Sequence, residues 1–107
     1  MPEPFAMTSV ARGHLLALTG RLDVTAAADV RLALAEALDQ GDGELVLDVG
    51  ALDAVDVTGL GVLVGAHRRA GRSGRSLVLR DVTPAVGRLL HMTKLDRVLA
   101  QRRSPVA

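Results

Sequence analysis

The chain has 107 residues, a length that fits one domain. Hydrophobic residues make up 49% of it, enough for a core, but Phe5 is the only aromatic residue, so the core must consist of Leu, Val and Ala. This composition favours helices packed on a small sheet over an all-β sandwich. The net charge of +1 provides no field that attracts DNA or an anionic membrane, and the absence of cysteine excludes disulfides and thiolate sites.

The N-terminal residues and the lengths of the apolar runs predict a cytoplasmic location. Met1-Pro2-Glu3-Pro4 places an acid and two prolines where an export signal needs basic residues followed by an apolar run. The longest apolar stretch, Gly59 to Ala66, is far shorter than the ~20 residues that span a bilayer. We therefore expect no membrane segment.

The N-terminal half predicts a β-hairpin followed by a helix. Ala6–Ala11 and His14–Gly20 are short apolar runs separated by an Arg-Gly turn, which is the pattern of two antiparallel strands. Thr25 can cap a helix over Ala26–Gln40, in which apolar residues recur at helical spacing, and Gly41 ends it.

A strand, a helix and another strand are expected next. Glu44–Val49 is a continuous apolar run, typical of a central strand covered on both faces. A link over residues 50–57 then leads to a helix over Thr58–Arg72. The segment Arg75–Arg80 contains the following strand.

The C-terminal part predicts a third helix that begins near Thr83-Pro84, because proline suits the first helical turn. Residues 96–100 form a last short strand or turn, and residues 101–107 are expected to be a flexible tail. The order β-β-α-β-α-β-α predicts one α/β domain over residues 5–100, with a small mixed sheet and helices packed mainly on one face.

Several motifs could indicate other chemistry but do so weakly. The three histidines, His14, His67 and His91, match no metal-ligand spacing, and no nucleophile lies in a triad context. Gly59–Gly65 lies where a dinucleotide fingerprint belongs, but Val64 occupies the position of its third glycine. We therefore expect no metal, no cofactor and no enzymatic activity, and we expect small residues to bring this helix close to the sheet.

A basic cluster closes the second predicted helix. It consists of Arg68, Arg69, Arg72 and Arg75. Its simplest interpretation is that cations complement the C-terminus of that helix. The alternative, a nucleic-acid contact, predicts a steeply salt-dependent affinity but lacks the interleaved aromatic residues of such surfaces.

Thr58 is the candidate functional residue. It lies between a loop and an apolar helix, a natural N-cap position, beside unpaired N–H groups and the positive end of the helix dipole. A phosphate added there carries about −1.5 to −2 charges and is tolerated by the helix. Together with Asp56 it would make the surface anionic, and a partner packed on it would bury an unpaired charge.

The segment Asp56–Leu63 resembles the signature of STAS domains in bacterial anti-sigma factor antagonists. Three other segments are similar to the family's motifs and occur in the family's order. They are Gly20-Arg21-Leu22-Asp23, Leu45-Val46-Leu47-Asp48 and Leu95-Asp96-Arg97-Val98. Many members have serine in both middle positions of the signature, where this chain has Val57 and Thr58.

The resemblance implies a switch in transcription regulation. The unphosphorylated protein would bind an anti-sigma factor that is also a serine/threonine kinase, this kinase would phosphorylate Thr58, and a phosphatase would reset the protein. The free protein is expected to be a monomer. The implied partner-binding residues are Asp23, Asp56, Val57, Thr58, Gly59 and Leu60.

The sequence is also compatible with other functions. A STAS domain can be an adaptor subunit of a stress-signalling assembly or of a lipid-transport ATPase complex, in which Thr58 is never modified. A small-nucleotide sensor or an NTP-hydrolysing domain is a further alternative, which equilibrium binding of ATP and GTP tests.

Overall fold

The computed structural model describes residues 5–105, in which a pair of strands is followed by helices and strands in turn. The strands lie in one mixed sheet in sequential order, with the first pair antiparallel and the remaining pairs parallel. They are β1 (Ala6–Ala11), β2 (Leu15–Leu22), β3 (Glu44–Val55), β4 (Ser76–Arg80) and β5 (Ala100–Arg102). The helices are α1 (Ala27–Asp39), α2 (Val57–Arg72), α3 (Pro84–Met92) and the 3-10 helix η1 (Leu95–Arg97).

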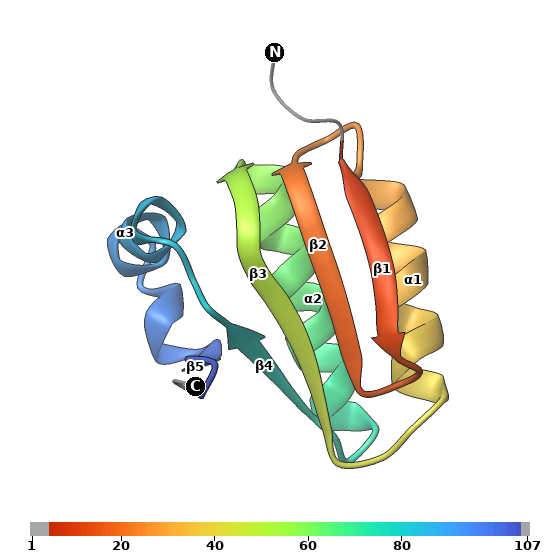
Figure 1. The fold of residues 1–107 in the computed structure, drawn as a ribbon. Coiled ribbons are helices and arrows are strands. Elements are labelled where there is room, and N and C mark those ends of the chain that lie inside the picture. The colour runs from red at the N-terminus through yellow and green to blue at the C-terminus, as the bar shows by residue number, and fades with distance from the viewer. Residues whose placement is uncertain (1–4, 106–107) are drawn as a thin grey trace.

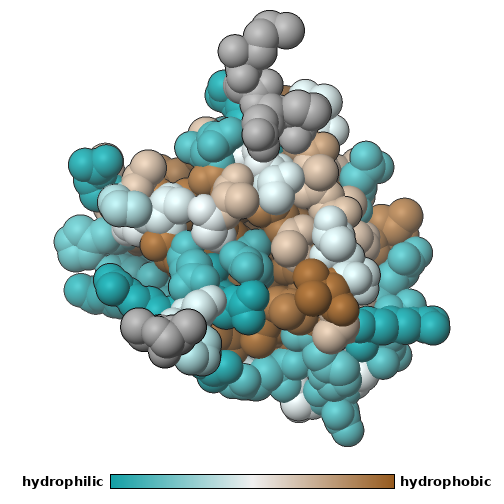
Figure 2. All heavy atoms as spheres, viewed as in Figure 1, coloured by the Kyte–Doolittle hydropathy of each residue, from teal (hydrophilic) through white to brown (hydrophobic). Residues whose placement is uncertain are grey.

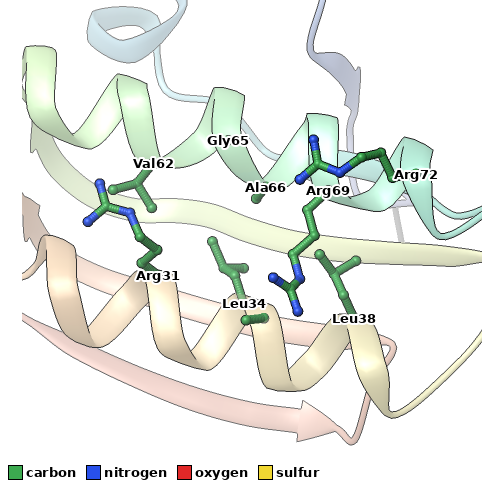
Figure 3. A pocket seen from close by; sticks show the side chains of 9 residues that line it. Arg31, Leu34, Leu38, Val62, Gly65, Ala66, Arg69 and Arg72 are labelled. Carbon is green, nitrogen blue, oxygen red and sulfur yellow. The ribbon is translucent and has the colours of Figure 1, made fainter.

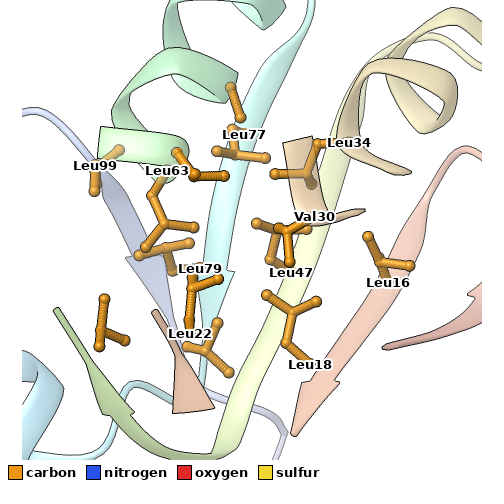
Figure 4. Close-up of a cluster of buried hydrophobic side chains, with 14 of the residues drawn as sticks. Leu16, Leu18, Leu22, Val30, Leu34, Leu47, Leu63, Leu77, Leu79 and Leu99 are labelled. Atoms are coloured by element: carbon orange, nitrogen blue, oxygen red, sulfur yellow. The ribbon is translucent and has the colours of Figure 1, made fainter. Parts of the chain in front are cut away.

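Helices α1 and α2 lie side by side behind the sheet, so one face of the sheet is covered and the other is open (Figure 1). The covered face holds the core, in which leucine and valine side chains from β2, β3, β4 and the two helices interlock (Figure 4). Leu18, Leu47 and Leu63 are fully buried there. This arrangement confirms the predicted fold class.

The open face corrects the expectation that the central strand is covered on both sides. Along β3, buried Leu45, Leu47 and Val49 alternate with half-buried Val46 and Asp48. Figure 2 views this open face and shows hydrophobic side chains interrupted by hydrophilic ones. The segment Glu44–Val49 reads as a continuous apolar run because Val46, on the open face of the sheet, is also apolar.

The expected link over residues 50–57 is wrong, because β3 continues through Val55. The strand stays paired with β2, and the register between the two strands shifts between Ala17 and Thr19 and again between Gly20 and Arg21. Extra residues on β3 at these bulges let the longer strand follow the shorter one. Glycine at position 50 favours a break in the sequence pattern, but in this sheet it lies within the first bulge, between Asp48 and Ala51.

The C-terminal segment differs from the expected flexible tail. Gln101 and Arg102 pair with β4 in β5, and the backbone N–H of Asp81 donates to the Arg102 carbonyl at 2.8 Å. The Asp81 carboxylate in turn accepts the backbone N–H of Ser104 at 2.7 Å. The domain therefore includes residues beyond the expected boundary at 100, and positions 106 and 107 lie outside the described residues.

Arg75 corrects the interpretation of the basic cluster. Its side chain is buried, with 6% exposed, and its guanidinium donates to the carbonyls of Ala37 at 2.9 Å and Leu38 at 3.1 Å. A third bond of 2.6 Å reaches the Gly13 carbonyl in the β1–β2 turn. Arg75 therefore complements the C-terminus of α1, rather than that of α2, and ties it to the hairpin.

Candidate functional site

The candidate site lies where β2 and β3 end side by side. Leu22 and Val55 are register partners, and the backbone N–H of Asp56 donates to the Leu22 carbonyl at 3.2 Å. Because the two strands are parallel, the residues that follow them, Asp23 and Asp56, reach the same edge of the sheet. A shallow hollow of about 190 Å³ lies there, lined by Arg21, Leu22, Asp23, Val24, Ala54, Val55 and Asp56.

Asp56 is the N-cap of α2, a role that the sequence suggested for Thr58. Its backbone is extended, and its Oδ1 accepts the N–H of Gly59 at 2.8 Å. This bond satisfies one of the donors that an α-helix leaves unpaired in its first turn. The helix consequently begins at Val57, one residue earlier than expected.

The N-cap position of α1 is Ala26 and no side chain caps it, which corrects the expected cap at Thr25. Asp23 instead stabilises the turn that precedes the helix. Its Oδ1 accepts the N–H groups of Thr25 at 3.0 Å and Ala26 at 3.3 Å. The turn over residues 24–26 thus precedes the helix, which begins at Ala27. Both carboxylates of the site fix their position on the surface by bonding to their own backbone.

Thr58 is the second residue of α2 and is half-buried. Its hydroxyl forms no hydrogen bond to any residue in the range 5–105, because the capping function belongs to Asp56. The first N–H groups of a helix lack intrahelical partners and favour an anion nearby. The Thr58 hydroxyl therefore has no hydrogen-bond partner among residues 5–105, and the N-terminus of α2 would stabilise a phosphate attached to it.

Gly59 fixes how closely α2 approaches the sheet. A Cβ at this position would lie 2.3 Å from the Leu22 carbonyl oxygen and 2.9 Å from Val55 Cγ1. The expected close packing of small residues is thus confirmed at Gly59, whereas a Cβ at Gly61 or Gly65 would meet open space.

The structure divides the predicted partner-binding residues into two groups. Asp56 and Val57 are exposed, and Asp23 and Thr58 are half-buried at the surface. Gly59 and Leu60 are buried and support the site from below. Those two buried residues present no surface to a partner in this conformation.

Exposed apolar residues surround the predicted residue Val57, and two of them, Val24 and Met92, were missed from the sequence. Val57 is 83% exposed, and Val24, which follows Asp23, is 70% exposed. A second hollow of about 300 Å³ shares Ala54 and Val55 with the first and extends to α3, where Met92 is 78% exposed. An apolar residue inside a polar turn, as at Val24, was the signal available for part of this surface.

Within residues 5–105, no group of three or more His, Asp or Glu side chains is arranged to hold a metal ion. Over the same residues, no helix combines the length and apolar character needed to cross a membrane.

The fold and the site define a known domain class. The profile of the family described as "Mlab, STAS domain" matches residues 6–101. The chain therefore belongs to the STAS domain family. It is similar to the anti-sigma F factor antagonist of Paenibacillus polymyxa, with 34% identity over 90 residues, which are 82% of this chain and 77% of that protein.

Solved structures agree with this fold. An anti-sigma factor antagonist from Mycobacterium paratuberculosis matches with a TM-score of 0.74 and 24% identity, over 94% of this chain and 89% of that chain. Unphosphorylated SpoIIAA matches with a TM-score of 0.75 and 18% identity, over 95% and 89% of the two chains. The phosphorylated form of SpoIIAA, a Bacillus cell fate determinant, matches with a TM-score of 0.67 and 19% identity, over 95% and 92%. At these identities the likeness establishes the fold.

Proposed function

We propose that this protein is an anti-sigma factor antagonist that binds an anti-sigma factor kinase and is switched off by phosphorylation of Thr58. The observation that carries the proposal is the Thr58 hydroxyl, which lies in the first turn of α2 without a hydrogen-bond partner in residues 5–105. The name of the Paenibacillus relative supports the class of partner. SpoIIAA, which shares the fold, has been solved in a phosphorylated form.

The surface around Thr58 suits a protein partner. Exposed Val24 and Val57 supply apolar contact area, and Asp23 and Asp56 line the neighbouring hollow. Each carboxylate uses one oxygen for its own backbone and keeps the other for a donor on the partner. A basic, partly apolar surface on the kinase complements this arrangement.

The chemical step needs ATP from the kinase. The Thr58 oxygen attacks the γ-phosphorus, a P–O bond forms to the threonine, the bond to the β-phosphate oxygen breaks, and ADP leaves while the hydroxyl proton passes to a base of the kinase. A phosphatase reverses the modification by hydrolysis. The antagonist itself contributes an accessible hydroxyl and a helix start, so we propose no catalytic activity for it.

The switch follows from charge burial. A phosphate at the second residue of α2 is favoured by the helix, so the fold of the antagonist is retained. The kinase surface that packed on Val57 and Thr58 would have to desolvate this charge beside Asp56, which costs several kcal/mol. At about 1.4 kcal/mol per tenfold change, such a cost is sufficient to release the complex. Transcription would thereby be regulated indirectly, in the cytoplasm.

The test is the phosphorylation state of the protein in its own cells. Intact-mass spectrometry and site mapping are compared for the wild type and a Thr58→Ala variant, in growing, starved and stressed cells. One phosphate that maps to Thr58, together with binding of the unphosphorylated form alone to a purified anti-sigma factor kinase, supports the proposal. A protein that is never phosphorylated under these conditions, and that co-purifies with a membrane ATPase, would instead be an adaptor subunit.

A further inference from the structure

A groove runs between α1 and α2 on the helical side of the molecule (Figure 3). Its volume is about 190 Å³, and its floor is apolar. The floor residues, all buried, are Leu34, Leu38, Val62 and Ala66. Neither the sequence motifs nor the proposed phosphorylation switch assigns a function to this groove.

Gly65 opens the groove at its centre. A Cβ at this position would have no heavy atom within 4 Å, so packing against the rest of the protein does not require glycine. Glycine in a helix interior is less favourable than alanine by about 1 kcal/mol. The open space above Gly65 is therefore kept at a cost to the stability of α2, in contrast to Gly59, where glycine is sterically required.

Three arginines line the groove, and its lining contains no acidic residue. Arg31 extends from α1 toward Val62, whereas Arg69 extends from α2 between Leu34 and Leu38 (Figure 3). Arg72 completes the set near the end of α2. Arg69 has one internal partner, Asp39, at 3.7 Å, and both side chains of this pair are exposed. An exposed pair of this kind contributes little, so an external carboxylate can take the place of Asp39.

The groove residues of α2 lie on the same face of the helix as Thr58. Thr58, Val62 and Gly65 follow one another at spacings of four and three residues, and Arg69 continues the series. Residues at these spacings share a helix face. A partner that contacts the start of α2 is therefore directed along the groove.

We propose that this groove receives an acidic amphipathic helix of the anti-sigma factor, with an apolar side chain above Gly65 and carboxylates paired with Arg31, Arg69 and Arg72. The volume is below the roughly 300 Å³ at which small-molecule sites begin, so a side chain fits better than a free ligand. Guanidinium groups pair with carboxylates in a bidentate manner, and a helix in a groove anchors its apolar residues at helical spacing. Only the identity of the protein that carries the helix rests on the proposed function.

The groove is tested with a defined probe, independently of the kinase. The probe is an acetylated helical peptide of about 15 residues, with Leu at helical spacing on one face and Glu and Ala elsewhere. A matched peptide carries Gln in place of each Glu. Both are titrated into the ¹⁵N-labelled protein at low and high salt. We expect saturating shifts confined to the amides around Gly65, Ala66 and Leu34, and binding of the Gln peptide weaker by about tenfold or more.

Variants of the protein sharpen this test. Gly65→Leu fills the open space above position 65, and the double variant Arg69→Gln/Arg72→Gln removes two positive charges. Each should weaken binding of the acidic peptide by about tenfold. Asp39→Asn frees Arg69 and should tighten binding about threefold. Gly65→Ala is the control for helix propensity, and circular dichroism checks that each variant folds. Equal binding of the two peptides, or shifts that Gly65→Leu leaves unchanged, would overturn the groove proposal.

Kinase binding by variants at Thr58 and at Gly65 distinguishes the role of the groove from the phosphorylation switch. Loss of kinase binding in Thr58→Glu tests the switch, whereas loss in Gly65→Leu with Thr58 intact tests the groove. If the kinase binds both groove variants like the wild type, the groove is not its docking surface and the switch still stands. If the kinase fails to bind the wild type, the proposed function fails, and the peptide titration still decides whether the groove takes an acidic helix.

Discussion

Gly59 lies so close to Leu22 that a Cβ on the glycine would be 2.3 Å from the leucine carbonyl oxygen. The atom it would meet belongs to the backbone of β2, so a side-chain rotation cannot relieve the contact. The same stretch of β2 leads directly to Asp23, and the helix that contains Gly59 also carries Thr58. One close approach therefore sets the spacing between the two halves of the site.

The first prediction is that Gly59→Ala destabilises the protein by about 3 kcal/mol, because α2 must move away from β2. Gly61→Ala is the matched control, since a Cβ there meets open space and alanine is the better helix former. It should stabilise the fold by roughly 0.5–1 kcal/mol. Urea unfolding of both variants measures the difference. Equal stabilities of the two variants would show that the approach to Leu22 is not constrained.

The second prediction concerns Arg75. Arg75→Ala leaves the carbonyls of Gly13, Ala37 and Leu38 without their buried donor and should destabilise the fold by about 3 kcal/mol. Arg75→Lys keeps the charge but not the planar fork of donors, so it should restore only part of the stability. Arg68→Ala is the control, because Arg68 is exposed, and its effect should stay within about 0.5 kcal/mol. A loss no larger than that of Arg68→Ala would contradict the role of Arg75 as a structural anchor.

Local signals predicted the elements that depend on local chemistry. Ala6–Ala11 forms a strand with the expected bounds, and α3 begins at Pro84 with Thr83 as its cap, whose side chain accepts the Val86 N–H at 3.3 Å. In both cases the residues that decide the element lie within it or next to it. The order of strands and helices followed from these signals, and so did the fold class.

Features set by long-range contacts could not be predicted in this way. The second half of β3 depends on pairing with β2, and the role of Arg75 depends on carbonyls as far as 62 residues away. At the site, Asp56 and Thr58 are both good capping residues, so the sequence alone could not choose between them. The structure shows Asp56 as the cap, because its carboxylate accepts the Gly59 N–H at 2.8 Å.

The third prediction is a loss of stability in acid. The hydrogen bond from Arg102, at 2.7 Å to Glu44 Oε2, holds the pKa of Glu44 below its ordinary value of 4.5, and the Arg102 charge adds to the effect. Hydrogen bonds from the hydroxyl and then the backbone N–H of Ser104 hold the pKa of Asp81 below 3.8. A carboxyl whose pKa is lower in the folded state stabilises the fold above its unfolded pKa. That stabilisation is lost as the pH falls below these values and through the folded pKa.

The measurement is the urea midpoint as a function of pH. Arg102→Gln removes the partner of Glu44, so the midpoint should be lower near neutral pH and should fall less steeply below pH 4.5. Ser104→Ala removes one of the two donors to Asp81 and should flatten the curve below pH 3.8. Curves that are parallel to the wild type for both variants would rule out these pairs as the source of the acid dependence.

The last prediction separates the capping role of Asp56 from its role at the surface. Asparagine caps a helix about as well as aspartate, so Asp56→Asn should keep the bond to the Gly59 N–H and change stability by less than about 0.5 kcal/mol. Asp56→Ala loses the cap and should destabilise the fold by about 1 kcal/mol. If the carboxylate contacts a basic group of the kinase, both variants should weaken kinase binding by about tenfold, since the charge is absent from each. Thermal unfolding and equilibrium binding, measured on the same samples, distinguish the two roles. Binding lost in Asp56→Ala but retained in Asp56→Asn would assign Asp56 to the helix start alone, and the partner contact would then rest on Thr58 and its apolar neighbours.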